Sequence, residues 1–285
     1  MLRALYVDLD GTLLGGGGSL FADAEGGFTL EAARALQACA RAGVEVVIYT
    51  GRKQEGVDVI ARLLGQRSYI FELGCGLVLD GELEWLTGEI GPSEQDGTIY
   101  EQIAASGAAQ ALLAAFPGQL EYHTPWSDGR EISHLFRGLI DSDEAAELLA
   151  AGGWDWLRLV DNGVIAAQSG ARELASGTST RSWGIAVERV HVYHLIPAPA
   201  SKAAAVARHM QNRGYRRDEV IACGDSREDM DAADVVGSFW LMANAVARDP
   251  GIAAAAAARG NVRIASAAMG AGVYEAVVTT LAEHG

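Results

Sequence analysis

The chain has 285 residues, which is enough for one large α/β domain or for two domains of ordinary size. Hydrophobic residues make up 49% and charged residues 21%, a composition that excludes wholesale disorder and coiled coils. The net charge of −15 argues against nucleic acid as a partner, because phosphate backbones are bound by surfaces with a basic excess. An acidic chain still binds anionic small molecules where a metal ion or a few cations reverse the local field.

The cysteines and the apolar runs bear on the cellular compartment. Cys39, Cys75 and Cys223 are widely spaced, which favours neither a disulfide framework nor a thiolate zinc site. The first residues read as a strand rather than as a signal peptide, and no apolar run approaches the ~20 residues of a membrane span. The sequence thus predicts a cytoplasmic protein with no membrane partner and leaves the oligomeric state open.

Apolar strands alternate with helices at both ends of the chain. Strands are expected over residues 2–9, 44–50, 68–73, 220–223, 239–242 and 262–265. Helices are expected between and after them, over residues 29–42, 54–64, 201–213, 246–259 and 273–283. This alternation is typical of an α/β fold with a doubly wound parallel sheet.

The pattern changes to α+β between residues 79 and 196. Asp80-Gly81 is a hairpin signal, and helices are expected over residues 98–116 and 142–151, with strands over 120–123, 132–139, 156–160 and 187–195. We interpret residues 79–196 as a domain inserted into a core that residues 1–78 and 197–285 form together.

Two carboxylates stand at the end of the first predicted strand, in Asp8-Leu9-Asp10-Gly11-Thr12. Charges at the end of a buried strand need hydrogen bonds, a cation or a metal to compensate them. The alternative is a solvated turn, because Asp-Gly is also a turn signal.

Two further segments could bind an anion. Thr50-Gly51 ends the second strand, where a hydroxyl and backbone N–H groups can face a ligand, although Thr50 could equally be a helix cap. Lys202 is one of only two lysines and begins a helix after Ser201. A cation at a helix N-terminus is unfavourable unless an anion is also there, and the alternative is an exposed helix lysine.

A fourth segment, Gly224-Asp225-Ser226-Arg227-Glu228-Asp229, again follows a strand. Asp225 and Asp229 are spaced to approach one cation, although acidic residues also suit the first turn of any helix. If the four segments converge at one edge of the sheet, the carboxylates can hold Mg²⁺ while Thr50 and Lys202 hold a phosphate.

In their order along the chain, these four segments resemble the motifs of the haloacid dehalogenase (HAD) superfamily of phosphatases. The inserted domain resembles the large α+β cap of the Cof-like branch, which includes sucrose-phosphate and mannosyl-3-phosphoglycerate phosphatases. Leu73, Cys75 and Glu228 depart from the residues usual in that branch, whereas Asn244-Ala245 resembles its Asn-Ala.

The resemblance implies a role for each matching residue. Asp8 would be the nucleophile that forms an aspartyl-phosphate, and Asp10 the general acid and then the general base. Mg²⁺ would be held by Asp8, Asp225, Asp229 and the backbone carbonyl of Asp10. Phosphate would be bound by Leu9, Thr50, Gly51, Lys202 and Asn244, of which Thr50 and Lys202 are also catalytic.

We expect the inserted domain to contact the rest of the substrate, because the core motifs bind only phosphate and Mg²⁺. The candidates there are Trp126, Arg130, His134, Arg137 and Arg181, which can stack on a sugar or donate hydrogen bonds. Arg130 and Arg137 are seven residues apart on a strand-like stretch, so strict alternation predicts opposite faces. Most tryptophans of the domain are expected in its own core.

The predicted function is therefore Mg²⁺-dependent hydrolysis of a small phosphorylated metabolite, in particular a sugar phosphate. One alternative is a phosphotransferase that uses the same intermediate with an acceptor other than water. Another is a non-catalytic binding protein on a degenerate scaffold, which the presence of the full set of motif residues disfavours.

Overall fold

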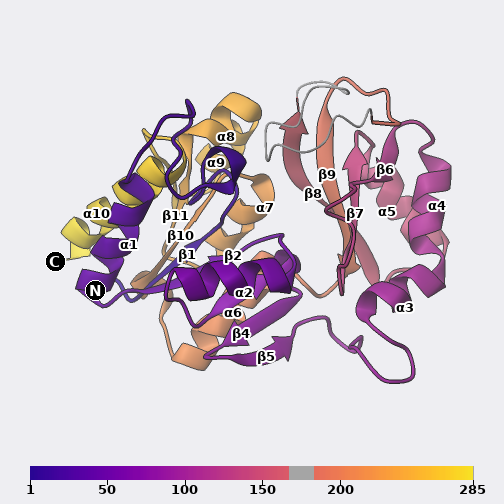
Figure 1. The fold of residues 1–285 in the computed structure, drawn as a ribbon, viewed down its shortest axis with the longest axis horizontal. Helices are drawn as coiled ribbons and strands as arrows, with labels where there is room; N and C mark the ends of the chain where they lie inside the picture. The colour runs from indigo at the N-terminus through magenta and orange to yellow at the C-terminus, as the bar shows by residue number, and fades with distance from the viewer. Residues whose placement is uncertain (167–182, 285) are drawn as a thin grey trace. The chain divides into compact units, whose positions relative to one another are not determined.

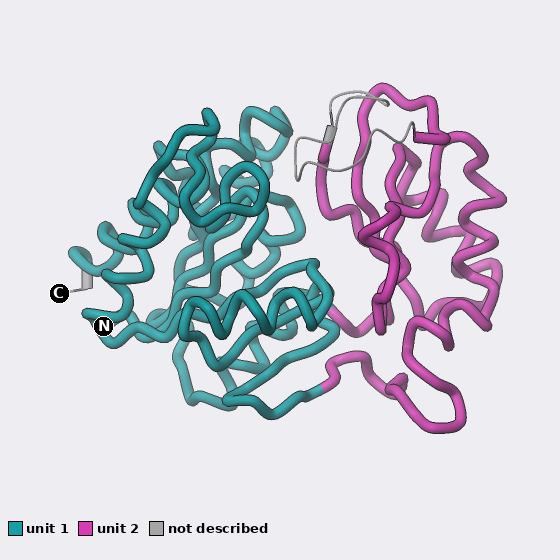
Figure 2. Tube along the Cα trace, in the orientation of Figure 1, with its two compact units in different colours: residues 1–84, 174–177, 201–285 teal, residues 85–173, 178–200 magenta. Residues whose placement is uncertain are grey.

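The computed structural model describes residues 1–166 and 183–284, which divide into two compact units (Figure 2). Within this part, the first unit holds residues 1–84 and 201–284, and the second holds residues 85–166 and 183–200. The first unit extends beyond the predicted residue 78 because the hairpin at Asp80-Gly81 continues its sheet. Its second segment begins at Ser201 rather than at residue 197.

The first unit is built on an eight-stranded sheet with the order β12-β11-β10-β1-β2-β3-β4-β5 (Figure 1). Its strands are β1 (Ala4–Val7), β2 (Glu45–Tyr49), β3 (Tyr69–Phe71), β4 (Gly76–Leu79), β5 (Glu82–Trp85), β10 (Val220–Gly224), β11 (Ser238–Leu241) and β12 (Val262–Ile264). The strands from β12 to β3 are parallel, and β4 is antiparallel to β3. Every residue of β1 and β10 is buried, as in central strands with both faces covered.

The helices of the first unit connect these strands. They are α1 (Glu31–Ala42), α2 (Gln54–Leu63), α6 (Lys202–Arg213), α7 (Arg227–Met230), α8 (Ala243–Arg248), α9 (Ile252–Ala257) and α10 (Met269–His284). The prediction of one helix over residues 246–259 is wrong, because Pro250 separates α8 from α9. The predicted α/β class with a doubly wound parallel sheet is confirmed.

The second unit has a four-stranded antiparallel sheet with the order β6-β7-β9-β8. Its strands are β6 (Leu120–Tyr122), β7 (His134–Gly138), β8 (Leu157–Ala166) and β9 (Val190–Pro197), and its helices are α3 (Ile99–Ser106), α4 (Ala108–Ala115) and α5 (Ser142–Ala151). The single helix predicted over residues 98–116 is wrong, since Gly107 adopts a left-handed conformation and ends α3.

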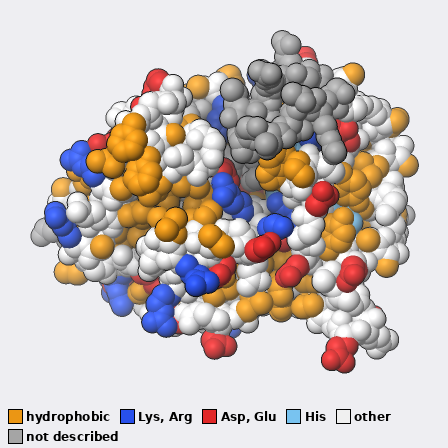
Figure 3. Space-filling view, in the orientation of Figure 1, with side chains coloured by type: hydrophobic (Ala, Val, Ile, Leu, Met, Phe, Trp, Pro, Cys, Tyr) orange, Lys and Arg blue, Asp and Glu red, His pale blue; other side chains and the backbone are white. Residues whose placement is uncertain are grey.

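The surface carries charged side chains of both signs. Acidic and basic side chains are interspersed on the face that Figure 3 shows. In the described ranges, 1–166 and 183–284, no helix has both the length and the apolar character to cross a membrane. The three cysteines are free and buried.

Candidate active site

Three of the four segments singled out in the sequence directly follow parallel strands of the first unit. Asp8 comes directly after β1, Thr50 after β2 and Asp225 after β10. Because β1 pairs with both β2 and β10, the carboxyl ends of the three strands meet at one edge of the sheet. This is the edge at which open α/β sheets bind ligands.

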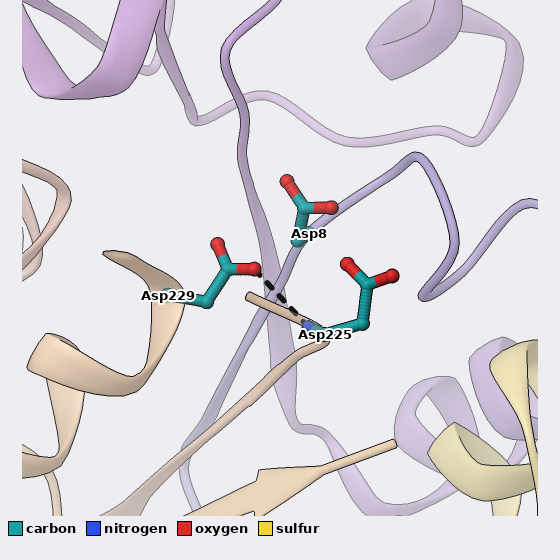
Figure 4. Close-up of side chains that lie close together, drawn as sticks. All are labelled: Asp8, Asp225 and Asp229. Carbon is teal, nitrogen blue, oxygen red and sulfur yellow. Dashed lines mark hydrogen bonds between the residues drawn. The ribbon is translucent and has the colours of Figure 1, made fainter. Parts of the chain in front are cut away.

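Three carboxylates form a cluster at this edge. One oxygen each from Asp8, Asp225 and Asp229 lies within 4.8 Å of the others (Figure 4). Asp8 and Asp229 are buried, and the Asp225 side chain is only 6% exposed. Three carboxylate oxygens are hard donors that fit Mg²⁺ better than zinc.

Lys202 joins the cluster from the first turn of α6. Its Nζ donates to Oδ1 of Asp8 at 2.9 Å and to Oδ1 of Asp229, and its side chain is 1% exposed. Ser201 caps the helix by accepting from the backbone N–H of Ala204, as predicted. The alternative of an exposed helix lysine is therefore wrong.

Glu228 is a third carboxylate beside Lys202. Its Oε2 lies 3.6 Å from Nζ, and its Oε1 accepts from the backbone N–H of Lys202 at 3.4 Å. The residue that departs from the family pattern thus contacts both ends of the lysine. Three buried carboxylates, of Asp8, Glu228 and Asp229, therefore contact Lys202.

Asp229 organises the loop after β10. Its Oδ2 accepts from the backbone N–H groups of Asp225 and Ser226, both at 3.1 Å, and from the Ser226 hydroxyl at 2.7 Å. Its Oδ1 accepts from Lys202. With both oxygens engaged, Asp229 positions its neighbours and would reach a cation through water more readily than directly.

The tight turn at Leu73-Gly74 contacts the backbone of Thr50. The backbone N–H of Leu73 donates to the carbonyl of Thr50 at 3.0 Å, and Leu73 is fully buried with a positive φ of 58°. Gly74 follows with a φ of 90°, and a Cβ there would lie 2.1 Å from the Ser201 carbonyl oxygen. The turn therefore couples the Thr50 loop to the start of α6.

Asp10 is not a member of the three-carboxylate cluster and pairs with Arg52. The guanidinium donates through Nε to Oδ2 at 2.7 Å and through Nη2 to Oδ1 at 2.5 Å. The Asp10 side chain is 57% exposed, so it is accessible to solvent and to a bound molecule. Thr50 is buried and its hydroxyl accepts from the Arg52 N–H at 3.3 Å.

Asn244, which the resemblance assigns to phosphate, contacts Asp225 in the structure. Its amide donates to Oδ2 of Asp225 at 3.1 Å and to the Gly11 carbonyl at 2.9 Å. Its Oδ1 accepts from the backbone N–H of Met269. Arg248 also donates to Oδ2 of Asp225.

Burial and nearby charges shift the pKa values of Asp8, Asp225 and Lys202. Burial raises the pKa of Asp8 well above its ordinary value, against the opposing charge of Lys202. Burial likewise raises the pKa of Asp225 to about 6, although Arg248 opposes the shift. Burial alone would lower the pKa of Lys202, but attraction to Asp229, Asp8 and Glu228 raises it.

Sequence reasoning missed the roles of Arg52, Glu228 and Arg248. Arg52 directly follows Thr50-Gly51, but nothing in the neighbouring sequence pairs it with Asp10. Glu228 stood out only as a departure from the family pattern. Arg248 is 23 residues from Asp225 and had no local signal, because only the packing of α8 brings the two together.

The candidates in the second unit differ in accessibility. His134 is buried, stacks on Tyr100 with ring centroids 3.9 Å apart, and has its ring nitrogens near the Tyr122 hydroxyl and the Tyr100 carbonyl. It therefore serves the interior of this unit. Trp126 is 38% exposed and stacks on His123.

Arg130 and Arg137 do not follow the predicted alternation along one strand. Arg130 lies in the loop before β7 and donates to the Trp126 carbonyl at 3.0 Å. Arg137 lies within β7, is buried and pairs with Glu121 at 2.7 Å. Both guanidinium groups act on His123 and, with its burial as the main cause, lower its pKa to about 3. Arg181 lies outside the described residues.

Solved phosphatases of the HAD superfamily share this fold. Sucrose-phosphatase from Synechocystis sp. PCC6803, in complex with sucrose and phosphate, matches with a TM-score of 0.64 over 98% of each chain at 14% identity. A HAD superfamily phosphatase from Bacteroides thetaiotaomicron matches with a TM-score of 0.60 over 98% of this chain and 95% of its own, at 16% identity. The chain therefore has the HAD fold, and this part of the resemblance is confirmed.

A curated relative is similar in sequence as well. Phosphoglycolate phosphatase of Pyrobaculum neutrophilum is 29% identical over 234 residues, which are 75% of this chain and 92% of the relative. No protein-family model matches the chain. The name of this curated relative agrees with the expected class of enzyme, a phosphoric monoester hydrolase.

Proposed function

We propose that the chain is a Mg²⁺-dependent phosphatase that hydrolyses a small phosphorylated metabolite. The observation that carries the proposal is the contact of Lys202 with Asp8 inside a cluster of buried carboxylates. A buried lysine among carboxylates supplies the point charge that a phosphate needs, and the carboxylates suit a hard divalent cation. The HAD fold and the phosphatase relatives support the same reaction.

In the proposed reaction, a carboxylate oxygen of Asp8 attacks phosphorus while the ester P–O bond breaks. Asp10 gives a proton to the leaving oxygen, so that an alcohol departs and an aspartyl-phosphate remains. Asp10 then takes a proton from water as this water attacks phosphorus, and the bond to Asp8 breaks to release inorganic phosphate. Arg52 would hold the Asp10 carboxylate in place through both steps.

Thr50, Gly51 and Leu9 are proposed to bind the phosphoryl oxygens through the Thr50 hydroxyl and backbone N–H groups, beside the Lys202 ammonium. Mg²⁺ would be held directly by Asp8, Asp225 and the Asp10 carbonyl, and through water by Asp229. The ion would offset the negative charge that otherwise repels a phosphate dianion from Asp8. For Asn244, its contacts support a role in orienting Asp225.

A sugar phosphate is the proposed substrate class. The sucrose-phosphatase with the same fold supports it, and the curated relative named for phosphoglycolate makes a phosphorylated hydroxy acid the first rival. A phosphotransferase reaction differs only in the acceptor that attacks the aspartyl-phosphate. As the sequence predicted, we assign the first unit as the catalytic core and the second as the cap that contacts the rest of the substrate. A cytoplasmic location also stays a prediction.

The test is a panel of phosphate esters incubated with the purified full chain and Mg²⁺. Release of inorganic phosphate is expected for a few members of the panel, with loss of release after EDTA treatment and recovery on adding Mg²⁺. Ca²⁺ is expected to inhibit, because its looser coordination would misplace Asp8. Full activity after removal of all divalent metal would rule out the proposed mechanism, and phosphate appearing on an added alcohol would identify the phosphotransferase.

A further inference from the structure

Arg248 reaches a carboxylate of the active-site cluster from the last residue of α8. Its Nη2 donates to Oδ2 of Asp225, which is the oxygen that Asn244 also contacts. Asp225 is thus joined to a cation of the chain itself. The roles proposed above for the motif residues do not use this arginine.

Gly11 leaves the space in which Arg248 lies. Its φ of 81° is in the left-handed region, and a Cβ at this position would lie 2.6 Å from Nη2 of Arg248 and 2.3 Å from Oδ2 of Asp225. Any larger residue would therefore overlap both partners of the ion pair. The loop that carries Asp8 and Asp10 is shaped to admit the guanidinium.

The two cations of the cluster differ in how readily they can leave it. The Lys202 side chain is 1% exposed and touches three carboxylates, so moving it would strand buried charges. The Arg248 side chain is 42% exposed, and a long side chain with access to water can rotate away at small cost. Lys202 is therefore a fixed part of the site, and Arg248 is a displaceable one.

We infer that Arg248 is a built-in counter-ion of Asp225 that competes with the divalent cation for this carboxylate. The inference rests on the proposed function, which assigns Mg²⁺ to the cluster. A guanidinium and a divalent cation drawn to one partly buried carboxylate repel each other, so each weakens the binding of the other. Arg248 thus lowers the affinity of the site for Mg²⁺.

The test compares Mg²⁺ binding in the full chain and in Arg248→Gln, which keeps a long polar side chain but lacks the charge. Calorimetric titration with MgCl₂ at pH 8 gives the dissociation constant without reference to catalysis. Arg248→Gln is expected to bind Mg²⁺ about 5-fold more tightly or better, the lower end of typical coupling between two sites. Arg248→Met should tighten binding equally and Arg248→Lys, which keeps the charge, much less.

Arg263→Gln is the matched control, because it removes one positive charge from an exposed pair with Glu283. Equal affinity in wild type, Arg248→Gln and Arg248→Met, or weaker binding in both neutral variants, would overturn the inference and leave the proposed function standing. Absence of Mg²⁺ binding in every protein would instead overturn the proposed metal site, and the inference with it. Circular dichroism checks that the variants are folded, and a fold lost in one neutral variant leaves the other to decide.

Discussion

Asp8 and Lys202 are 194 positions apart in the sequence, and their side chains meet at 2.9 Å. The contact places a nucleophile candidate next to a permanent positive charge in a buried setting. Such a setting raises the pKa of the carboxyl group by desolvation while the ammonium opposes the rise. The chemistry of each residue therefore depends on the partner that the fold supplies.

Asp8→Asn is expected to reduce phosphate release to background while the fold persists, because an amide of the same shape cannot form the aspartyl-phosphate. Phosphate release from the best ester of the panel measures the effect, with circular dichroism as the check on folding. Retention of wild-type activity in a preparation free of contaminating phosphatase would contradict the role of Asp8.

Asp10→Asn should instead slow turnover with little change in KM.

Glu228→Gln tests the carboxylate at which the chain departs from the motifs it otherwise resembles. Glutamine keeps an oxygen for the backbone N–H of Lys202 but removes the charge 3.6 Å from Nζ. With less compensation of the ammonium, inorganic phosphate is expected to inhibit about 5-fold more strongly, which corresponds to ~1 kcal/mol. Inhibition constants at saturating Mg²⁺ measure this, with Glu283→Gln as a surface control. An unchanged constant would mean that Glu228 does not tune the phosphate site.

At the scale of elements, the active site depends on two contacts between α6 and the segment of β1 and Asp8. The Tyr6 hydroxyl of β1 lies 2.9 Å from Nδ1 of His209, and Asp8, directly after β1, accepts from Lys202 at 2.9 Å. Farther along α6, Arg213 donates to Glu45 at 2.9 Å and so ties the helix to β2. Because α6 is held at both ends, Lys202 has a fixed position in the site.

Glu45 makes this anchoring sensitive to acid. Burial acts to raise its pKa, but contacts with His209, Arg213 and Tyr215 outweigh burial and lower the pKa from 4.5 to about 2. A carboxyl group with a lowered pKa stabilises the fold above pH 4.5 and loses this contribution as the pH falls toward 2. Glu45→Gln should therefore lower the free energy of unfolding by about 3 kcal/mol at pH 7.

Urea unfolding at pH 7, 5 and 3 checks this prediction. The difference between wild type and Glu45→Gln should shrink as the pH falls, because the protonated glutamic acid resembles glutamine. Glu94→Gln, at an exposed position, serves as the control and should show no such trend. A difference that stays constant from pH 7 to pH 3 would mean that the charge of Glu45 does not stabilise the fold.

At the scale of the whole molecule, the chain combines two kinds of architecture. The first unit carries all the residues proposed for phosphate and Mg²⁺, and the second contributes aromatic and basic side chains on an antiparallel sheet. Because phosphate and Mg²⁺ are common to all candidate substrates, selectivity must come from contacts with the rest of the substrate. The second unit is the proposed source of those contacts.

Trp126→Ala is expected to lower kcat/KM for the true substrate by about 1–3 kcal/mol equivalent, with little effect on a small aryl phosphate. An exposed indole can stack on a sugar face, and alanine cannot. Trp154→Ala is the control, since Trp154 donates to the Ser106 carbonyl within the second unit and should affect both esters alike. Equal losses for both esters in Trp126→Ala would place selectivity elsewhere.

Sequence alone determined the elements whose signals are local. Apolar runs that alternate with helices predicted the parallel sheet, and Asp-Gly predicted the turn of the hairpin between β4 and β5, where both residues have positive φ. Carboxylates and a threonine at strand ends predicted where the site would form, because parallel strands bring their carboxyl ends to one edge. Gly107 and Pro250 are local signals for helix breaks, but the Ala-rich sequence on either side of each led to the prediction of a single helix.

Only the tertiary structure decided which side chains meet. Three ion pairs of the site join separate elements, and nothing in the neighbouring sequence fixes them. They are Glu228 with Lys202, Arg52 with Asp10 and Arg248 with Asp225. The burial of His134 and Arg137 likewise follows from packing within the second unit. Desolvation and charge pairing depend on distances in space, so the electrostatics of this site could be derived only once the chain was folded.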